Sequence, residues 1–509
     1  MKWWERLLPL GTVGLAFVLR VWGLGTQGLW ADEIATVMFA ERPTVPDQLK
    51  WLLNARNQPP GYHLTMRAWL WPGHQEFWVR VPSVLWATLA VAVIYALGRR
   101  MAGRRVGALA AFLLATSPLH VWHSQNARMY PMLVTLALLS NLFLVRLAKR
   151  ERWCDWLGYF VCSVAAMWTN FSAPFVILAQ MVYLVFTRRR YMKLVQHWFV
   201  CMVAMGLAFS PWAIAIFLNG GLHKAGIWWI PPARPFEPLV TWYSFVMGPA
   251  GAPDAFYGLF LVGGLTALAL LFYAAWATRR ESALLTLWLA LPAIMVMLIS
   301  LDLPIPQKRS AYLDRFLLAT LPPLLLLIAW GMVRLVQHRR RLGDLVCILV
   351  CVPMLVSLAR PYLDTRFRRD DWRGVLEYIN AHAKPGDRLL MHAGDVHVLY
   401  YYRARKDLLD TLVMIDAPSS TGKSNADAES GWHTETQKAS RVWFPVYVVP
   451  IQTHLWLEHR YADPVGRAME DEAKQWMDAR YQPVEEHEFT GIYLSLYEPG
   501  ANSQREHTR

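Results

Sequence analysis

Two adjacent carboxylates, Asp32 and Glu33, lie in the segment Trp30-Ala-Asp-Glu33, directly after the first hydrophobic stretch. Neighbouring carboxylates at a membrane surface can divide two roles, because one can act as an ionised general base while the other binds substrate or an ion. The structural alternative is a helix N-terminus, where the helix dipole favours acidic residues. The pair is therefore a candidate catalytic site with one competing explanation.

A polar island interrupts two hydrophobic stretches at residues 120–130. Its hydrogen-bonding side chains are His120, His123, Gln125, Arg128 and Tyr130. Ionisable groups near a membrane usually mark a pathway or a binding site. The alternative is a belt of side chains whose polar ends reach the membrane interface. We expect these five residues to bind substrate, with Arg128 as the cation among them.

Three cations lie close together in a second segment, Gln307-Lys-Arg-Ser-Ala-Tyr-Leu-Asp-Arg315. They suit an anionic lipid headgroup, since Arg can bind phosphate through two parallel hydrogen bonds. Ordinary surface charge is the alternative. We take Lys308 and Arg315 as candidate phosphate ligands.

Further substrate-binding candidates are Gln58, Tyr62 and His63, in the segment Asn57-Gln-Pro-Pro-Gly-Tyr-His63. All five cysteines fall in or beside apolar stretches, so neither a disulfide framework nor a thiolate metal site is indicated. No cofactor is expected, and dependence on a metal is left open. The chain also lacks a P-loop or dinucleotide-binding glycine pattern between its hydrophobic stretches, which argues against a nucleotide-dependent activity there.

Hydrophobic stretches must position these residues. Hydrophobic residues make up 55% of the chain and charged residues only 17%, against about a quarter in soluble proteins. The first stretch has no small-residue cleavage site after it, so we interpret it as a retained membrane span. Eleven spans are predicted, at residues 6–24, 79–98, 105–119, 130–147, 156–170, 172–187, 196–217, 255–276, 282–301, 316–334 and 343–359.

The distribution of charge predicts how the chain is oriented. The net charge of +14 divides into +18 for residues 1–359 (32 Lys+Arg, 14 Asp+Glu) and −4 for residues 360–509 (19 and 23). Every second loop is basic, which places these loops and the N-terminus in the cytoplasm and the C-terminal part outside. The positive charge therefore requires no nucleic-acid partner. Arg20, the cation within the first span, is close enough to its end to reach the interface.

The sequence predicts a polytopic α-helical membrane protein with two domains. Residues 1–359 form the transmembrane domain, whose outer loop 25–78 carries amphipathic pieces near Gln48–Arg56 and Tyr62–Trp71. Residues 360–509 form an extracytoplasmic α/β domain. Its expected elements are helices at Trp372–His382 and Asp463–Arg480, strands at Arg388–His392, Val442–Val449 and Gly491–Tyr497, and a mobile loop at Pro418–Ser440.

Several motifs together resemble the GT-C membrane glycosyltransferases. They are Trp30-x-Asp-Glu33, Gln58-Pro-Pro-x-Tyr62, Arg80-x-Pro-Ser83 and His123-Ser-Gln-x-x-Arg-x-Tyr130, within residues 10–150, and less specifically Asp371-Trp-Arg373. The nearest groups are the protein O-mannosyltransferases of family 39 and the bacterial aminoarabinose transferases that modify lipid A. Asn57-Gln58 stands where the latter have Glu-Lys, which removes a phosphate-binding cation and puts an aminoarabinose substrate in doubt.

The resemblance implies an inverting glycosyltransferase of the bacterial cytoplasmic membrane. Its donor would be a polyprenyl-phosphate sugar, and its acceptor a hydroxyl of a lipid, glycan or protein on the outer face. Asp32 would be the general base, assisted by Glu33, while Arg128, Lys308 and Arg315 would stabilise the departing phosphate. A transporter or flippase of a lipid-linked sugar is the alternative, and it would require polar residues deep within several spans. A non-catalytic scaffold is a third possibility.

Overall fold

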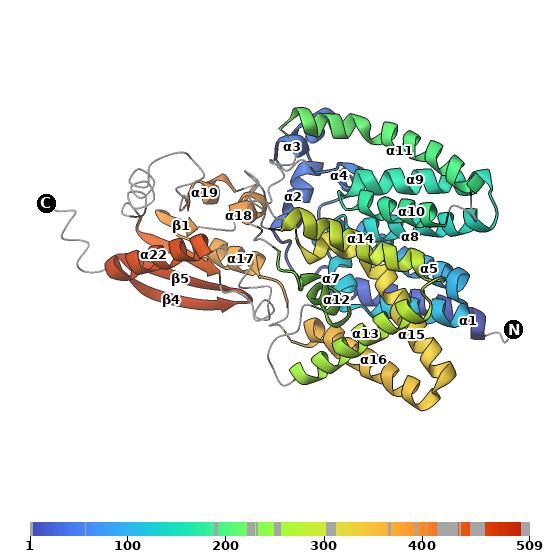
Figure 1. Ribbon diagram of the computed structural model, residues 1–509. Coiled ribbons are helices and arrows are strands. Elements are labelled where there is room, and N and C mark those ends of the chain that lie inside the picture. Colours follow the sequence, from blue (N-terminus) through green and yellow to red (C-terminus); the bar gives the residue numbers. More distant parts are fainter. Residues whose placement is uncertain are drawn as a thin grey trace. The chain divides into compact units, whose positions relative to one another are not determined.

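The computed structural model (Figure 1) describes residues 4–55, 58–187, 192–220, 230, 233–248, 256–301, 312–364, 368–391, 395–403, 405–414, 436, 439–447 and 464–499. The chain divides into two compact units. We call Met1–Leu24 with Thr36–Arg360 the helical unit, and Gly25–Ala35 with Pro361–Arg509 the C-terminal unit.

Long apolar helices make up the helical unit, and each of the eleven predicted spans coincides with one of them. The helices are α1 (Trp4–Val21), α5 (Glu76–Ala102), α6 (Arg104–Thr116), α8 (Tyr130–Lys149), α9 (Trp153–Thr169), α10 (Ala173–Phe186), α11 (Met192–Leu218), α13 (Tyr257–Ala277), α14 (Ala283–Ser300), α15 (Leu321–His338) and α16 (Arg340–Leu363). Within the described residues, seven helices are long and apolar enough to cross a membrane singly, α15 together with the preceding turn η2 (Asp314–Thr320) being one of them. The prediction of a multi-pass membrane protein is confirmed.

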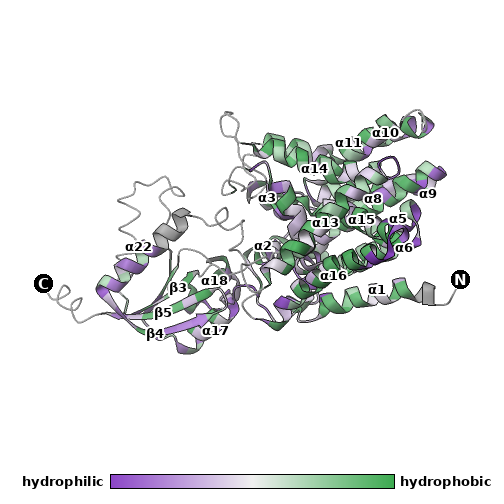
Figure 2. Cartoon of the chain, turned by 60° about the horizontal axis from the view of Figure 1, so that its bottom comes forward, coloured by the Kyte–Doolittle hydropathy of each residue, from purple (hydrophilic) through white to green (hydrophobic). Residues whose placement is uncertain are grey.

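Burial separates the central helices from those at the periphery. Each span contains an apolar window of 18 residues. In Asp314–His338, 83% of that window is buried, whereas in α11 only 17% of it is buried. Large apolar side chains of α11 such as Phe199, Leu207 and Phe217 are exposed. Figure 2 shows apolar residues along these helices. An exposed apolar surface of this extent is what a lipid-facing helix requires.

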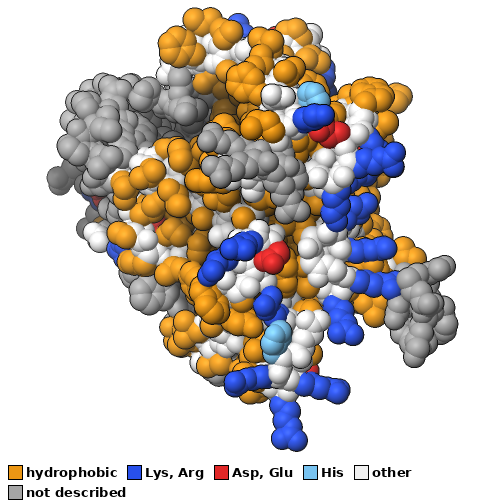
Figure 3. Space-filling model, turned by 45° about the vertical axis from the view of Figure 1, so that its right-hand side comes forward, with side chains coloured by type: hydrophobic (Ala, Val, Ile, Leu, Met, Phe, Trp, Pro, Cys, Tyr) orange, Lys and Arg blue, Asp and Glu red, His pale blue; other side chains and the backbone are white. Residues whose placement is uncertain are grey.

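Basic side chains gather on one face, as Figure 3 shows. Among the described residues, Arg99 and Arg100 lie in the last turn of α5, Arg146 and Lys149 in the last turn of α8, and Arg340 at the start of α16. These residues belong to the loops that the sequence assigns to the cytoplasm. The shared face is consistent with that assignment under the positive-inside rule.

A proline inside α5 shapes the helix near the polar residues. Pro82 has no N–H, so it cannot bond the carbonyl of Trp78 four residues earlier. That carbonyl instead accepts a hydrogen bond from Trp69 Nε1 at 2.9 Å, and Trp78 Nε1 donates to the carbonyl of Trp69 at 3.0 Å. The two indole rings stack with centroids 4.4 Å apart. These two hydrogen bonds join α5 to α4 (Gly61–Trp69) and give the Trp78 carbonyl the donor that Pro82 cannot supply.

A chain of neutral hydrogen bonds crosses α8, α9, α10 and α11. Gln180 Nε2 donates to Ser140 Oγ at 3.0 Å, and its Oε1 accepts from the hydroxyl of Tyr159 at 2.7 Å. The chain continues from Ser140 to Ser163 and from Tyr159 to Trp198. Since lipid offers no alternative partners, such side chains link helices inside a membrane protein.

The C-terminal unit is built on a mixed five-stranded sheet in the order β2-β1-β3-β5-β4. β1 (Asp387–Met391) pairs in parallel with β2 (Leu412–Met414) and β3 (Arg441–Tyr447), while β5 (Ile492–Pro499) is antiparallel to β3 and to β4 (Tyr481–Phe489). One core contains residues of α17 (Trp372–His382), α18 (Asp395–Tyr401) and α19 (Lys406–Leu409). A second core lies against α22 (Pro464–Arg480). Helices therefore cover both faces of the sheet.

Most predicted elements of this unit are present, with shifts of one or two residues at their ends. The helix Trp372–His382 is found with the predicted bounds. Strand β4 was missed because it lies at the sheet edge and exposes Gln482–Glu486, so it lacks the apolar alternation that marks a strand. Strand β2 and helices α18 and α19 were also missed. Apart from residues 436, 439 and 440, the loop expected at Pro418–Ser440 lies outside the described residues.

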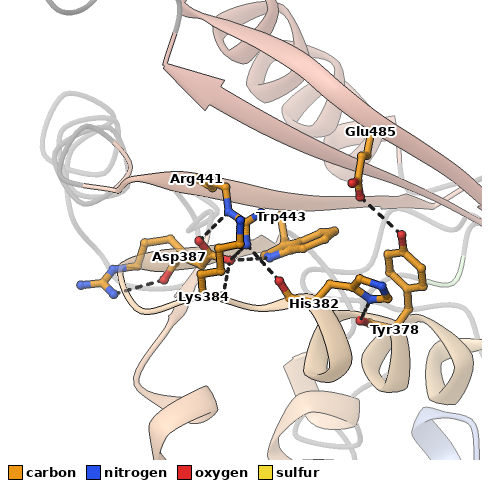
Figure 4. A network of polar contacts seen from close by, with 8 residues as sticks. Tyr378, His382, Lys384, Asp387, Arg441, Trp443 and Glu485 are labelled. Carbon is orange, nitrogen blue, oxygen red and sulfur yellow. Dashed lines mark hydrogen bonds and ion pairs between the residues drawn. The ribbon is translucent and has the colours of Figure 1, made fainter.

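A buried carboxylate fixes the start of β1, as Figure 4 shows. Asp387 is 1% exposed and accepts hydrogen bonds from Arg441 Nε at 3.0 Å and Nη2 at 2.7 Å. It also accepts from Trp443 Nε1 at 3.0 Å and from the backbone N–H of Lys384 at 2.9 Å. Four donors on two oxygens satisfy the ionised group, so its burial is compatible with a folded core.

The segment Gly25–Ala35 belongs to the C-terminal unit although it follows α1 in sequence. The hydroxyl of Tyr401 accepts a hydrogen bond from the N–H of Leu29 at 2.8 Å. Arg373 Nη2 donates to the carbonyl of Thr26 at 2.9 Å. The segment that carries Trp30-Ala-Asp-Glu33 is thus held by residues more than 330 positions away.

Candidate active site

The carboxylate pair lies in the first turn of α2 (Ala31–Ala40), and its two members differ in burial. Asp32 is half-buried, whereas Glu33 is 0% exposed. Glu33 Oε2 accepts a hydrogen bond from the backbone N–H of Trp30 at 3.3 Å, so it caps the helix. It also lies 3.4 Å from Arg369 Nη1 within the C-terminal unit. Glu33 therefore has structural partners, and Asp32 is the more accessible carboxylate.

Arg128 is buried in the helical unit and joined to three helices. Its Nη1 donates to Thr36 Oγ1 of α2 at 3.1 Å. Its carbonyl accepts from Ser83 Oγ of α5 at 3.2 Å, and Ser83 Oγ lies 2.9 Å from the hydroxyl of Tyr62 on α4. Residues from three separate motifs thus meet here, together with Thr36. Because Thr36 is neutral, this hydrogen bond does not itself neutralise the guanidinium charge.

His120 lies on the short helix α7 (Pro118–Ser124), which bends from α6 by 58°. Its Nδ1 is 2.8 Å from Arg20 Nη2. An arginine has donors only, so Nδ1 must accept and the ring proton must reside on Nε2. Within the described residues, buried Nε2 has no hydrogen-bond partner. The arrangement fixes the tautomer of His120 and leaves it one donor.

The prediction that Arg20 reaches the interface is wrong. Arg20 is 0% exposed and donates at 2.9–3.1 Å to backbone carbonyls of α1 and of the end of α6, namely those of Ala16, Leu114 and Ala115. Carbonyls at a helix C-terminus have no partners within the helix and carry partial negative charge. These carbonyls replace water as hydrogen-bond acceptors for the Arg20 guanidinium, so the cation can be buried inside the helical unit.

The remaining residues of the polar island have mainly structural contacts. Gln125 Nε2 donates to the carbonyl of Trp22 at 2.9 Å, past the end of α1. The rings of His123 and Tyr130 pack with centroids 5.1 Å apart, and both residues are buried. The interfacial belt considered as an alternative would require exposed polar ends. The burial of His120, His123, Arg128 and Tyr130 instead favours an internal polar cluster.

Of the three candidates in the first loop, Tyr62 contacts this cluster. Tyr62 contributes its hydroxyl to Ser83, as described above. His63 is 1% exposed, its ring packs edge-on against Phe39, and its carbonyl accepts from Gln48 Nε2 at 2.8 Å. Gln58 is half-buried, and its Oε1 has no hydrogen-bond partner within the described residues.

The second cationic segment is only partly described. Lys308 lies outside the described residues. Arg315 is half-buried in η2, where its backbone N–H donates to Asp314 Oδ1 at 2.6 Å. Its assignment as a phosphate ligand stays a prediction.

Three residues that contact predicted site residues were not themselves predicted. Thr36 and Arg369 bind Arg128 and Glu33, while Arg20 sets the tautomer of His120. Thr36 follows Asp32 by one helical turn, a spacing that places both near one face of α2. Arg369 has no comparable signal, since it is far from Glu33 in sequence. Among the described residues, no three His, Cys, Asp or Glu side chains form a metal-binding group.

Comparison with known proteins places this arrangement in a wider group. Residues 57–214 match the family model of dolichyl-phosphate-mannose-protein mannosyltransferases. The matched region contains Gln58, Tyr62, Ser83, His120 and Arg128. A comparison with curated protein sequences finds no match.

Solved structures resemble the whole chain at low sequence identity. ArnT from Cupriavidus metallidurans in the apo state has a TM-score of 0.56 at 14% identity, with 96% of this chain and 97% of that chain covered. The same protein bound to undecaprenyl phosphate gives 0.54 at 12% identity, with the same coverage. The archaeal oligosaccharyltransferase AglB from Archaeoglobus fulgidus, with an inhibitory peptide and a dolichol-phosphate, gives 0.52 at 10%, covering 98% and 75%.

Proposed function

We propose that this chain, whose fold and family match are those of GT-C membrane glycosyltransferases, transfers a sugar from a polyprenyl-phosphate donor to an acceptor hydroxyl. The observation that carries the proposal is Arg128, a buried cation of the helical unit bonded to the neutral Thr36; the carboxylate Asp32 is proposed beside it from the motif resemblance. A cation and a carboxylate are the two groups that a phosphate-releasing displacement needs.

The proposed reaction is a single inverting displacement. The acceptor oxygen forms a bond to the anomeric carbon while the bond from that carbon to the phosphate oxygen breaks, and its electron pair leaves with the phosphate. Asp32 accepts the hydroxyl proton, a role that typically adds about 10²–10⁴-fold to the rate. We assign this role to Asp32 rather than Glu33, because Glu33 is buried against Trp30 and Arg369.

Arg128 is proposed to stabilise the departing lipid phosphate. Negative charge grows on the phosphate as the bond breaks, so a cation already held in position lowers the barrier without reorganisation. Lys308 and Arg315 are proposed as further phosphate ligands, by resemblance alone. His120 is proposed to donate its Nε2 proton to a substrate oxygen, and Gln58 to bind substrate through its amide.

The comparisons support the donor class, and the distribution of charge supports the orientation. ArnT was solved with undecaprenyl phosphate and AglB with a dolichol-phosphate, and the matched family uses dolichyl-phosphate mannose. We propose a polyprenyl-phosphate sugar as donor and a lipid, glycan or protein as acceptor. The basic face of the helical unit supports a cytoplasmic N-terminus, and we propose that the reaction takes place on the outer face of a bacterial inner membrane.

The test is donor consumption by wild type and Asp32→Asn. Each purified protein is incubated with a panel of radiolabelled polyprenyl-phosphate sugars and a membrane extract that supplies acceptors. We expect wild type to release sugar from one donor, and Asp32→Asn to be slower by about 10²-fold or more. Asp344→Asn is the matched control, since Asp344 lies on α16 with its side chain 58% exposed. Normal transfer by Asp32→Asn would refute the assignment of the base.

A further inference from the structure

A surface pocket of about 380 Å³ lies in the helical unit beside α3 (Val45–Ala55), apart from the Arg128 cluster in its lining residues. It is lined by Arg42, Pro43, Asp47, Lys50, Trp51 and Asn54. Two cations and one carboxylate give it a formal charge of +1. Its size falls within the range of small-molecule sites, of about 300–1,000 Å³.

Two contacts hold Arg42 in the pocket. Its side chain packs on the Trp51 ring, and its backbone carbonyl accepts a hydrogen bond from Arg67. Its guanidinium carbon lies 3.6 Å from the centre of the Trp51 ring, a cation–π contact. Arg67 of α4 donates to the carbonyls of Arg42 and Pro43, which fixes the turn that carries Arg42. Within the described residues, the guanidinium makes no hydrogen bond or ion pair, and its Nε is buried. A positioned cation with unused donors is suited to an anion.

The other pocket residues support the same ligand chemistry. The side chains of Lys50 and Asn54 make no hydrogen bond or ion pair within the described part of the chain. Asp47 is already engaged, since its Oδ2 accepts from Thr44 Oγ1 at 2.6 Å while its N–H donates back to Thr44 Oγ1 at 3.2 Å. This reciprocal pair begins α3 and occupies the carboxylate. Free donors therefore outnumber free acceptors in the pocket.

The pocket also adjoins apolar surface. Helix α3 exposes Val45 (43%) at its first position and Trp51 (45%), while Gln48 and Leu52 are buried. Exposed apolar and aromatic residues beside cations are typical of a helix lying at the membrane interface. An anion that reaches this site with a lipid tail can place the tail against this surface.

We propose that the pocket binds the phosphodiester of an anionic membrane phospholipid. The phosphate oxygens accept hydrogen bonds from Arg42 and Lys50, and the acyl chains lie beside Val45 and Trp51. This site is additional to the proposed donor site and does not depend on the transfer reaction. It would hold the first outer loop against the outer leaflet.

Photocrosslinking in nanodiscs tests the proposal. The full chain, with p-benzoylphenylalanine in place of Val45, is placed in equal amounts of phosphatidylglycerol and phosphatidylcholine. The ratio of the two crosslinked lipids is then measured by mass spectrometry. We expect phosphatidylglycerol to be favoured by about fivefold, the ratio that ~1 kcal/mol produces. The double variant Arg42→Ala/Lys50→Ala should return the ratio to one, and Arg42→Lys should give an intermediate value.

A probe in place of Leu265, which is 55% exposed on α13, is the control position and should show no preference. A ratio of one at position 45 in the otherwise wild-type chain would overturn the proposal, as would a preference that survives the double variant in monodisperse protein. Loss of the preference on adding millimolar inorganic phosphate would assign the pocket to free phosphate and overturn the lipid assignment.

Discussion

Each unit buries an arginine, but the two arginines have different partners. Arg20 in the helical unit is 0% exposed, and neutral acceptors are among its partners: three backbone carbonyls and His120 Nδ1. Arg441 in the C-terminal unit has its side chain 12% exposed and makes two hydrogen bonds to the Asp387 carboxylate. Arg20 is thus stabilised by backbone carbonyls, including those at the end of α6, whereas Arg441 is stabilised by a side chain of opposite charge.

The difference follows from what each unit contains. Apolar helices offer few carboxylates, but the last carbonyls of each helix lack partners and carry partial negative charge. In the C-terminal unit, a paired carboxylate at the start of β1 joins two strands and the turn before them. Loss of Arg20 therefore leaves neutral acceptors unsatisfied, whereas loss of Arg441 leaves the buried Asp387 carboxylate without its counter-ion. Three substitutions test this contrast.

The largest effect on stability is expected for Arg441→Met. It leaves the buried Asp387 without its counter-ion, and breaking a buried pair in this way typically costs about 3–5 kcal/mol. Hydrogen exchange of the β1 and β3 amides in the full chain measures the loss. Arg405→Met is the matched control, because Arg405 pairs with Asp407 at the surface, where both side chains are at least half exposed. Equal exchange in the two variants would show that burial of the pair contributes nothing.

A smaller effect is expected for Arg20→Met. It leaves neutral acceptors unsatisfied, at a cost of about 1–3 kcal/mol, and removes the donor that sets the His120 tautomer. Thermal unfolding in detergent measures stability, and nitrogen NMR of labelled histidine reports the tautomer. Arg100→Met, at the exposed end of α5, should change neither quantity. A loss as large as that of Arg441→Met would remove the distinction between the two arginines.

The smallest effect is expected for Gln180→Leu in the helical unit. It cuts the neutral chain between Ser140 and Tyr159, and such interhelical bonds are worth about 0.6–1.7 kcal/mol each. Thermal unfolding is again the measurement. Thr266→Val serves as control, since the Thr266 hydroxyl bonds only its own helix on an exposed face. A larger loss than for Arg20→Met would show that neutral networks, not the buried cation, dominate this unit.

The site was predictable where sequence motifs contain its residues. Arg128, Tyr62 and Ser83 were named from separate motifs, and the structure joins them through hydrogen bonds. The partner of Glu33 was not predictable, since Arg369 is 336 residues away and its neighbours are also basic. The sequence prediction for Arg20 was wrong for a physical reason. The position of a residue in a span gives its distance from the interface, but it does not show that backbone carbonyls of another helix lie within hydrogen-bonding distance.

The sequence by itself determined the class of this protein: eleven apolar stretches, alternating basic loops and an α/β tail follow from hydropathy, charge and periodicity, which are local properties of the chain. Only the tertiary structure decided how residues are used. It assigned Gly25–Ala35 to the C-terminal unit, gave Glu33 a buried partner and left Asp32 more accessible. These outcomes depend on which groups meet after folding, because burial and hydrogen bonding are set by distant segments that no local pattern specifies.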